Sequence, residues 1–201
     1  MSEFSSLLKN RLTGLVELTP AQIALLESHY ELLRRWNRRM NLTSVREPEQ
    51  IVLRHYCESV LFGATLQPLG SSVVDIGTGP GFPGVPLAIL HPGVEVTLVE
   101  SNSRKCVFLR ESTRGLPNVV IREARAAEVS DHFDWAVARA VAWKDLALLL
   151  PAIASRVGFL VSNPDAEEIS KAIGFNWNSA VPVPWSRQRV MLFGGVSRGT
   201  S

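Results

Sequence analysis

Residues 75–84 read Asp-Ile-Gly-Thr-Gly-Pro-Gly-Phe-Pro-Gly. A β-rich run at residues 73–76 leads into this stretch and a helical stretch follows it, which is the context that a nucleotide-binding turn requires. Because Gly77, Gly79 and Gly81 have no side chains, the backbone can turn tightly there and approach a ligand closely. The stretch therefore predicts an α/β fold with a small ligand at the end of a strand.

The sequence after this turn alternates between short β-rich runs and helical stretches, which is typical of a parallel sheet with crossover helices. Five parallel strands are expected at residues 73–76, 95–99, 119–121, 134–137 and 158–161. Two further extended runs, at 180–183 and 189–193, are expected to form a hairpin, and Pro182 and Pro184 indicate that the first run lies at an edge. The predicted class is a Rossmann-like, mostly parallel α/β sheet closed by a C-terminal hairpin.

A helical extension is expected before the sheet. Thr19-Pro20-Ala21-Gln22 is typical of a helix start, since Thr can cap, Pro suits the first helical position and Gln completes a capping box. A second helix is expected over about residues 48 to 62, ending near Gly63. We therefore predict a helical extension over residues 1–70 and a Rossmann-like domain over 71–201. Apolar residues recur at helical spacing after the cap, at Ile23, Leu26, Tyr30, Leu33 and Met40.

The charge of the chain is nearly balanced. Lys and Arg number 21 against 19 Asp and Glu, so a net charge of +2 indicates nucleic-acid binding only if the positive charge is clustered. Such a cluster is present beside Trp36. It consists of Arg34, Arg35, Arg38 and Arg39, with Arg46 just beyond.

Other classes of protein are disfavoured by simple absences in the sequence. Cys57 and Cys106 belong to no CxxC pair or His-spaced set, so no metal is expected. The sequence has no long apolar run and no export signal, so we expect no membrane span and a cytoplasmic location.

Two ligands compete for the glycine-rich turn. Gly79, Gly81 and Gly84 form a GxGxxG, and Glu100 ends the next strand where a dinucleotide-binding fold places its ribose-binding acid. An NAD-dependent oxidoreductase is therefore a serious alternative. Asp75 favours S-adenosylmethionine instead, because a carboxylate before the first glycine repels a pyrophosphate and attracts a cationic donor.

Two charged side chains at strand ends are candidates for binding this ligand. The two oxygens of Glu100 can accept hydrogen bonds from both ribose hydroxyls, and a helix-capping acid is the alternative. Arg139 ends the fourth strand, at the edge where open α/β sheets bind ligands. Its guanidinium would hold the donor's carboxylate or an RNA phosphate, and an ion pair with Glu128 is the alternative.

Several segments together resemble the ribosomal RNA small-subunit methyltransferase G family (RsmG, formerly glucose-inhibited division protein B). The likeness covers roughly residues 20 to 195. It implies a class I S-adenosylmethionine-dependent methyltransferase fold. The segments are residues 36–45 (Trp-Asn-Arg-Arg-Met-Asn-Leu-Thr-Ser-Val), 54–59 (Arg-His-Tyr-Cys-Glu-Ser), the turn at 75–86, Glu100-Ser101 with 104–109 (Arg-Lys-Cys-Val-Phe-Leu), and 138–140 (Ala-Arg-Ala).

The resemblance implies that the product is N7-methylguanosine at nucleotide 527 of 16S rRNA, in the usual ribosomal numbering. The partner would be the small ribosomal subunit or an assembly intermediate. The donor would contact Gly77, Phe82, the main chain of Ala126 and Ala127, and Arg139. Alanines suit a main-chain role, because their N–H and C=O groups can bind an adenine edge.

The chain departs from the family pattern at three positions. Residues 161–164 read Val-Ser-Asn-Pro where the family has Lys-Gly, and Asn163 with Pro164 suits a helix start. Ala127 stands where the family often has an acid, with Glu128 beside it. Glu58 replaces an Asp. A donor-binding RNA module without turnover is therefore a second alternative function.

Methyl transfer to N7 needs no base, because N7 already has a lone pair. Catalysis then consists of orienting the reactants and stabilising the moving charge. Asp75 would set the donor, while Arg139 and His55 would orient the guanine or its phosphate; an interhelical hydrogen bond is the alternative role of His55. The expected RNA surface comprises Arg34, Arg35, Arg38, Arg39, Arg46, Arg54, Arg104 and Lys105.

Overall fold

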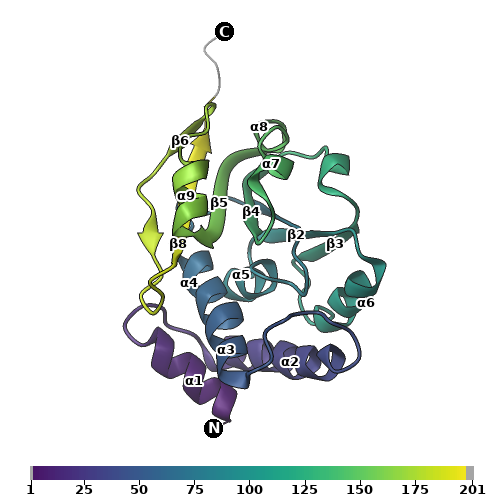
Figure 1. Ribbon diagram of the computed structural model, residues 1–201. Helices are drawn as coiled ribbons and strands as arrows, with labels where there is room; N and C mark the ends of the chain where they lie inside the picture. Colours follow the sequence, from purple (N-terminus) through teal and green to yellow (C-terminus); the bar gives the residue numbers. More distant parts are fainter. Residues whose placement is uncertain (1, 198–201) are drawn as a thin grey trace.

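The computed structural model describes residues 2–197, and within them the chain forms an eight-stranded mixed sheet with helices on both faces (Figure 1). The strand order is β3-β2-β1-β4-β5-β8-β6, with β7 also paired to β8. The strands are β1 (Ser72–Ile76), β2 (Glu95–Glu100), β3 (Val119–Glu123), β4 (Phe133–Arg139), β5 (Ala154–Ser162), β6 (Phe175–Trp177), β7 (Val181–Pro182) and β8 (Arg189–Val196).

The five predicted parallel strands are confirmed. β1 pairs in parallel with both β2 and β4, and β3 and β5 extend the sheet on either side. Side chains alternate between the faces, so Val73 belongs to one hydrophobic cluster and Val74 to the other. Because the order of strands reverses between β1 and β4, their carboxyl ends form the crevice in which such sheets bind ligands.

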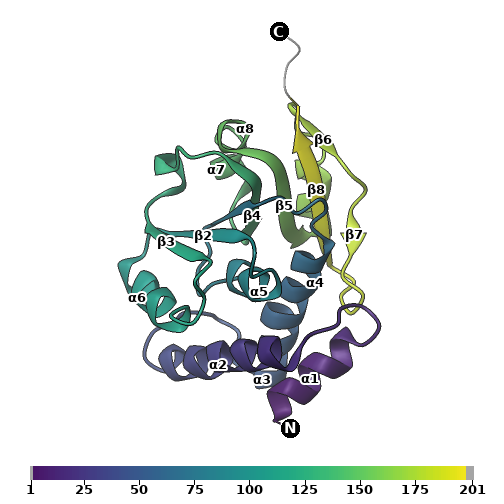
Figure 2. The ribbon, with the colours of Figure 1, turned by 180° about the vertical axis from the view of Figure 1, so that it is seen from behind.

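The predicted closing hairpin is also confirmed, with an addition. β8 runs antiparallel to β5. The two-residue strand β7 pairs with β8 and lies at the edge, as Pro182 and Pro184 indicated (Figure 2). The three-residue strand β6 was not predicted. Gly194 of β8 makes room for it, because a Cβ there would lie 2.6 Å from the Trp177 ring.

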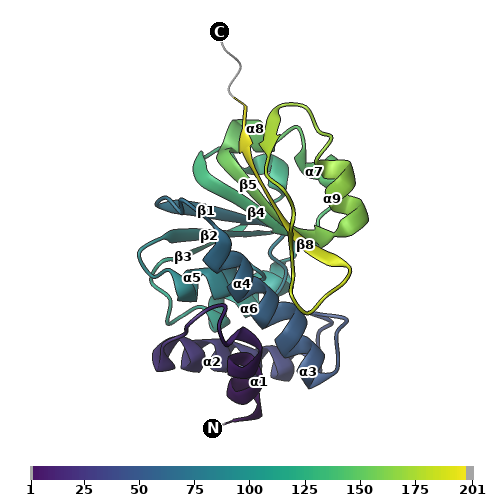
Figure 3. The same cartoon turned by 90° about the vertical axis from the view of Figure 1, so that its left-hand side faces the viewer.

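Helices cover the two faces of the sheet unequally (Figure 3). One face packs against α4, α5 and α6 with α2 below them, and α7, α8 and α9 cover the other. Within residues 2–197, no helix is long and apolar enough to cross a membrane. The helices are α1 (Glu3–Leu12), α2 (Pro20–Asn37), α3 (Pro48–Ile51), the π-helical turn η1 (Val52–Cys57), α4 (Glu58–Thr65), α5 (Gly84–Leu90), α6 (Ser103–Ser112), the 3-10 turn η2 (Ala126–Glu128), α7 (Trp143–Leu146), α8 (Leu150–Ile153) and α9 (Asn163–Ile169).

The first 70 residues share their core with the sheet. The predicted cap of α2 is confirmed, since Thr19 Oγ1 accepts from the Gln22 N–H at 3.2 Å and Gln22 Oε1 accepts from the Thr19 N–H at 2.9 Å. Helix α1 was not predicted. Its Leu8 and Phe62 of α4 belong to the same cluster as Val73 of β1. The division near residue 70 stays a prediction.

The second predicted helix is confirmed, and it ends two residues beyond Gly63. The segment continues as α3, η1 and α4 to Thr65, and Gly63 lies inside it. Gly63 is a packing residue there, because a Cβ would lie 3.5 Å from Leu87 Cα of α5. The π-helical turn in the middle loosens the helical hydrogen-bond ladder, and such turns frequently occur at functional sites.

Candidate functional site

Hydrogen bonds to the side chain of Asp75 stabilise the glycine-rich turn. This carboxylate is fully buried, and its Oδ2 accepts from the Thr78 hydroxyl at 2.6 Å and from the Gly84 N–H at 2.8 Å. Burial raises the pKa of Asp75 to about 7. Its Oδ1 is buried and has no hydrogen-bond partner among residues 2–197. Asp75 therefore shapes the turn, and its direct contact with a ligand stays a prediction.

Gly77 and Gly79 have no side chains, so the crevice beside the turn stays open. Gly77 has φ +68° and Gly79 has φ +61°, a backbone conformation that side chains disfavour. A Cβ on Gly77 would lie 2.7 Å from Val141 Cγ2, whereas a Cβ on Gly79 would meet nothing nearer than 4.0 Å. The turn thus presents bare backbone to the crevice.

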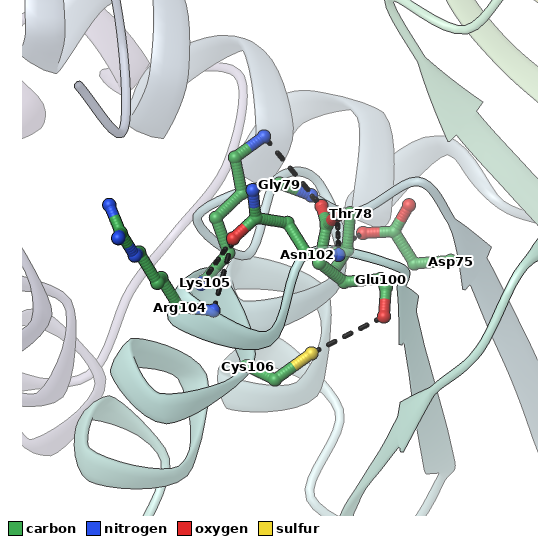
Figure 4. A network of polar contacts seen from close by, with 8 residues as sticks. All are labelled: Asp75, Thr78, Gly79, Glu100, Asn102, Arg104, Lys105 and Cys106. Atoms are coloured by element: carbon green, nitrogen blue, oxygen red, sulfur yellow. Dashed lines mark hydrogen bonds and ion pairs between the residues drawn. The ribbon is translucent and has the colours of Figure 1, made fainter. Parts of the chain in front are cut away.

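Glu100 links the end of β2 to the turn, as Figure 4 shows. Its Oε2 accepts from the Gly79 N–H at 3.0 Å and its Oε1 from the Asn102 N–H at 2.8 Å, while Lys105 Nζ lies 3.8 Å from Oε2. The alternative role as a helix cap is wrong, because Asn102 caps α6. Each carboxylate oxygen keeps a further lone pair that can accept a hydrogen bond from a ribose hydroxyl. The ribose role of Glu100 stays a prediction.

These contacts bear on the choice between ligands. A dinucleotide-binding turn offers its N–H groups to a pyrophosphate. Here the N–H groups of Gly79 and Gly84 already donate to the carboxylates of Glu100 and Asp75. Two carboxyl groups therefore occupy N–H donors that a diphosphate would need, and this arrangement disfavours NAD.

Arg139 at the end of β4 reaches across to the π-helical turn. Its Nη1 donates to the C=O of Arg54 and its Nη2 to His55 Nδ1, each at 2.7 Å. Burial lowers the pKa of Arg139 to about 10, so it is a cation at neutral pH. The alternative ion pair with Glu128 is wrong, since the Glu128 carboxylate instead accepts from the Arg125 N–H.

His55 lies between Arg139 and Thr43. Its Nε2 is 2.8 Å from Thr43 Oγ1. Because a guanidinium only donates, His55 Nδ1 must accept, and its proton must be on Nε2. Burial, helped by the charge of Arg139, lowers the pKa of His55 to about 3, so the ring is neutral at physiological pH. His55 therefore positions its neighbours and does not serve as an acid or base; the bond to Thr43 joins the loop after α2 to the helix.

A pocket of about 230 Å³ opens over the turn. Phe82, stacked on His55 with ring centroids 4.9 Å apart, forms part of its wall. Arg139 and Lys105 are the charged residues that line it. Ala126 and Ala127 lie outside this pocket, in η2 after β3. The lining residues are Leu42, Thr43, His55, Gly77, Thr78, Gly79, Pro80, Phe82, Lys105, Arg139 and Ala140.

A second pocket of about 460 Å³ adjoins the first, because Ala140 lines both. Ala140 has φ 57°, and a non-glycine residue in this conformation costs roughly 1–2 kcal/mol. Strain of this kind concentrates at functional sites. Ser162, from the segment that reads Val-Ser-Asn-Pro in place of Lys-Gly, lines this pocket, and so does the cation Lys144.

The helix start expected at Asn163 and Pro164 is confirmed as the start of α9, with Ser162 as its N-cap. Glu58 is buried, with Oε2 2.9 Å from Arg189 Nε of β8. The longer acid therefore joins α4 to the closing strand.

Only some of the arginines predicted to bind RNA line one common pocket. Arg35, Arg38 and Arg39 line a pocket of about 470 Å³ together with Trp36 and Met40. Arg34 instead lies over the Tyr30 ring at 5.5 Å. Arg46 donates to Asn41, Arg54 donates to Gln50, and Arg104 is exposed at the start of α6. None of these arginines forms an ion pair within the described residues.

The cysteines and acids show no metal centre. Cys57 and Cys106 are buried and unpaired, and burial raises the pKa of the Cys57 thiol to about 12. In the part of the chain that the structure describes, no group of three or more His, Cys, Asp or Glu side chains is placed to hold a metal ion.

Known proteins of one family match this chain. The model of the family described as rRNA small subunit methyltransferase G matches residues 22–155. A protein of that name from Stenotrophomonas maltophilia is 47% identical over 116 residues, covering 55% of this chain and 53% of the relative. One from Erwinia tasmaniensis is 37% identical over 146 residues, covering 71% of this chain and 69% of the relative. The chain thus spans about half the length of the first of these relatives.

Solved structures share the fold at low sequence identity. A SAM-dependent methyltransferase from Aquifex aeolicus has a TM-score of 0.63 at 12% identity, covering 78% of this chain and 97% of that one. Magnesium protoporphyrin IX methyltransferase from Synechocystis, solved with bound SAM, has a TM-score of 0.62 at 15% identity, covering 90% and 99%. These likenesses show that the sheet and its helices form a methyltransferase-like fold.

Proposed function

The chain belongs to the rRNA small subunit methyltransferase G family, and on that premise we propose that it transfers a methyl group from S-adenosylmethionine to N7 of guanine 527 in 16S rRNA. One observation supports the choice of donor above all. Two carboxylates, Asp75 and Glu100, hold the N–H groups of the turn beside a pocket lined by cations. The occupied N–H groups leave a diphosphate without its usual backbone donors, while the neighbouring cations suit the carboxylate of a zwitterionic donor.

The residues present fit this donor. The bare backbone of Gly77 and Gly79 leaves room for its amino-acid end, and Arg139 with Lys105 would balance its carboxylate. Glu100 would bind the ribose. The main chain of Ala126 and Ala127 would bind the adenine, at the same carboxyl edge of the sheet as Glu100.

For this reaction the protein must orient the two reactants and stabilise the charge that moves between them. When bound, S-adenosylmethionine supplies a sulfonium methyl group, and its transfer to N7 leaves the electron pair on sulfur and removes no proton. The neutral His55 and the cationic Arg139 agree with this scheme, since neither is needed as a base. Their task is to hold the reactants at near-attack geometry, which supplies a large part of such rate enhancements.

The donor is tested by calorimetric titration of the purified chain with S-adenosylhomocysteine and, separately, with NAD⁺. We expect binding of S-adenosylhomocysteine and none of NAD⁺. Binding of NAD⁺ alone would instead support the oxidoreductase.

Glu100→Gln is expected to weaken S-adenosylhomocysteine binding by about 10- to 100-fold, because the amide turns one acceptor into a donor facing the backbone N–H groups. Turnover at saturating donor should change little, since ribose contacts are alike in the ground and transition states. Titration and initial rates measure the two effects. A large fall in turnover with unchanged affinity would remove Glu100 from the ribose role.

The arginines that line one pocket test the RNA surface. Replacing Arg35, Arg38 and Arg39 with Gln should weaken small-subunit binding and flatten its salt dependence, because each phosphate contact contributes roughly 0.7 to 0.9 log units of affinity per log unit of salt. Donor affinity should not change. Binding is measured at several salt concentrations.

A control variant loses the same number of positive charges at other places on the surface. Arg11, Arg114 and Arg187 are exposed arginines elsewhere, and their replacement by Gln should leave the salt slope unchanged. Equal slopes for both triple variants would place RNA binding elsewhere, with Arg104 and Lys105 the next candidates.

A further inference from the structure

A directed chain of hydrogen bonds ends inside the pocket over the turn. Arg139 Nη2 donates to His55 Nδ1 at 2.7 Å, and His55 Nε2–H donates to Thr43 Oγ1 at 2.8 Å. Both bonds point the same way, and the chain starts at a cation. Hydrogen bonds in such a chain polarise one another, so the last group becomes a stronger donor.

The Thr43 hydroxyl is the last group of this chain. Its oxygen accepts from His55 and, at 3.2 Å, from the Val45 N–H, so both lone pairs are used. Its own proton has no hydrogen-bond acceptor among residues 2–197. Thr43 is 9% exposed, and it lines the pocket. The hydroxyl proton is therefore available to a ligand there.

The charge of the pocket indicates which ligand group this is. Arg139 and Lys105 line it, and no Asp or Glu is among its lining residues. Two of the five guanidinium N–H groups of Arg139 are used within the protein. A carboxylate or a phosphate accepts hydrogen bonds and balances this charge, and the carboxylate is the one that the proposed methyl donor carries.

We propose that the Thr43 hydroxyl binds the carboxylate of the methyl donor, as the end of the Arg139–His55–Thr43 chain. The inference rests on the proposed function, because it takes S-adenosylmethionine as the donor. Thr43 is then a binding residue supplied by the loop after α2, so the helical extension completes a site built mainly on the sheet. The main rival acceptor for the same proton is guanine O6.

The test pairs one change in the protein with one change in the ligand. Thr43→Val removes the hydroxyl at nearly constant volume, and Thr43→Ser retains it. Each variant and the wild type are titrated with S-adenosylhomocysteine and with its decarboxylated analogue, S-adenosyl-3-thiopropylamine, which keeps the amine. Thermal unfolding accompanies the titrations, and Thr43→Ala serves if Thr43→Val does not fold.

Thr43→Val should bind S-adenosylhomocysteine about tenfold or more weakly, as loss of a hydrogen bond to a charged group implies. It should bind the decarboxylated analogue as the wild type does, and Thr43→Ser should stay close to the wild type with both. An equal loss for both ligands would overturn the proposal in favour of a purely structural role.

Methyl transfer to small subunits is measured for the same variants. Unchanged affinity with reduced turnover would also overturn the proposal, because that result assigns the proton to the RNA, at guanine O6 or a phosphate. If the wild type bound neither nucleoside, the proposed function itself would fail. If it bound S-adenosylhomocysteine and Thr43→Val bound it equally well, only this inference would fail.

Discussion

Gly77→Val is expected to lose S-adenosylhomocysteine binding by about 100-fold or more, because filling the ligand's space removes several favourable contacts at once. Gly77 has φ +68°, and a Cβ there would lie 2.7 Å from Val141 Cγ2. A branched side chain must therefore shift the wall of the pocket as well as enter it. The left-handed backbone adds a stability cost of roughly 1–2 kcal/mol.

Gly14→Val is the matched control for this experiment. Gly14 has φ +76°, and nothing lies within 4 Å of a Cβ built on it, so it has the same backbone strain without the crowding. Both variants should lose stability in thermal unfolding, Gly77→Val more than Gly14→Val because of the contact with Val141, and only Gly77→Val should lose the ligand. Wild-type affinity in a folded Gly77→Val protein would refute the placement of the ligand over the turn.

Arg139→Met should have the second large effect. It removes a cation from the pocket and leaves the Arg54 C=O and His55 Nδ1 without their donor. A charge-assisted hydrogen bond from Arg139 to the ligand's carboxylate would contribute about 1.5–3 kcal/mol. Its loss predicts roughly 100-fold weaker S-adenosylhomocysteine binding. Arg139→Lys should recover only part of this, since an ammonium cannot reproduce the planar fork. Calorimetric titration measures both variants.

Arg156→Met is the control for the loss of a half-buried arginine. Arg156 of β5 lies over the Trp135 ring at 5.3 Å and does not line the pocket. Its replacement should cost some stability and leave ligand affinity unchanged. If Arg139→Met bound the ligand as tightly as Arg156→Met, the guanidinium would have no part in donor binding.

The sequence predicts the sheet well because its signals are local. Short, nearly continuous apolar runs mark each parallel strand, and glycines with Asp75 mark the turn between β1 and α5. What it misses is short or depends on tertiary contacts. Strand β6 has three residues, and it pairs only because Gly194 of β8 makes room for Trp177. The π-helical turn at residues 52–57 leaves no signal in the apolar pattern.

The candidate site is predictable to a similar extent. Residues at strand ends, such as Glu100 and Arg139, are expected at one edge because parallel strands share it. Thr43 belongs to the motif that carried the family resemblance, yet no spacing rule predicts its bond to His55. That contact joins a loop to the π-helical turn, and the turn sets where His55 points.

The account is tested most directly by methyl transfer itself. The purified chain is incubated with methyl-labelled S-adenosylmethionine and small ribosomal subunits that lack the modification. One part of the 16S rRNA is digested to nucleosides to identify the labelled base, and another part is digested to oligonucleotides to locate it. The account predicts label in N7-methylguanosine at nucleotide 527, and strongly reduced label when Arg139→Met replaces the wild type at limiting donor. Label at another base or position, or no transfer by a chain that binds S-adenosylhomocysteine, would contradict it.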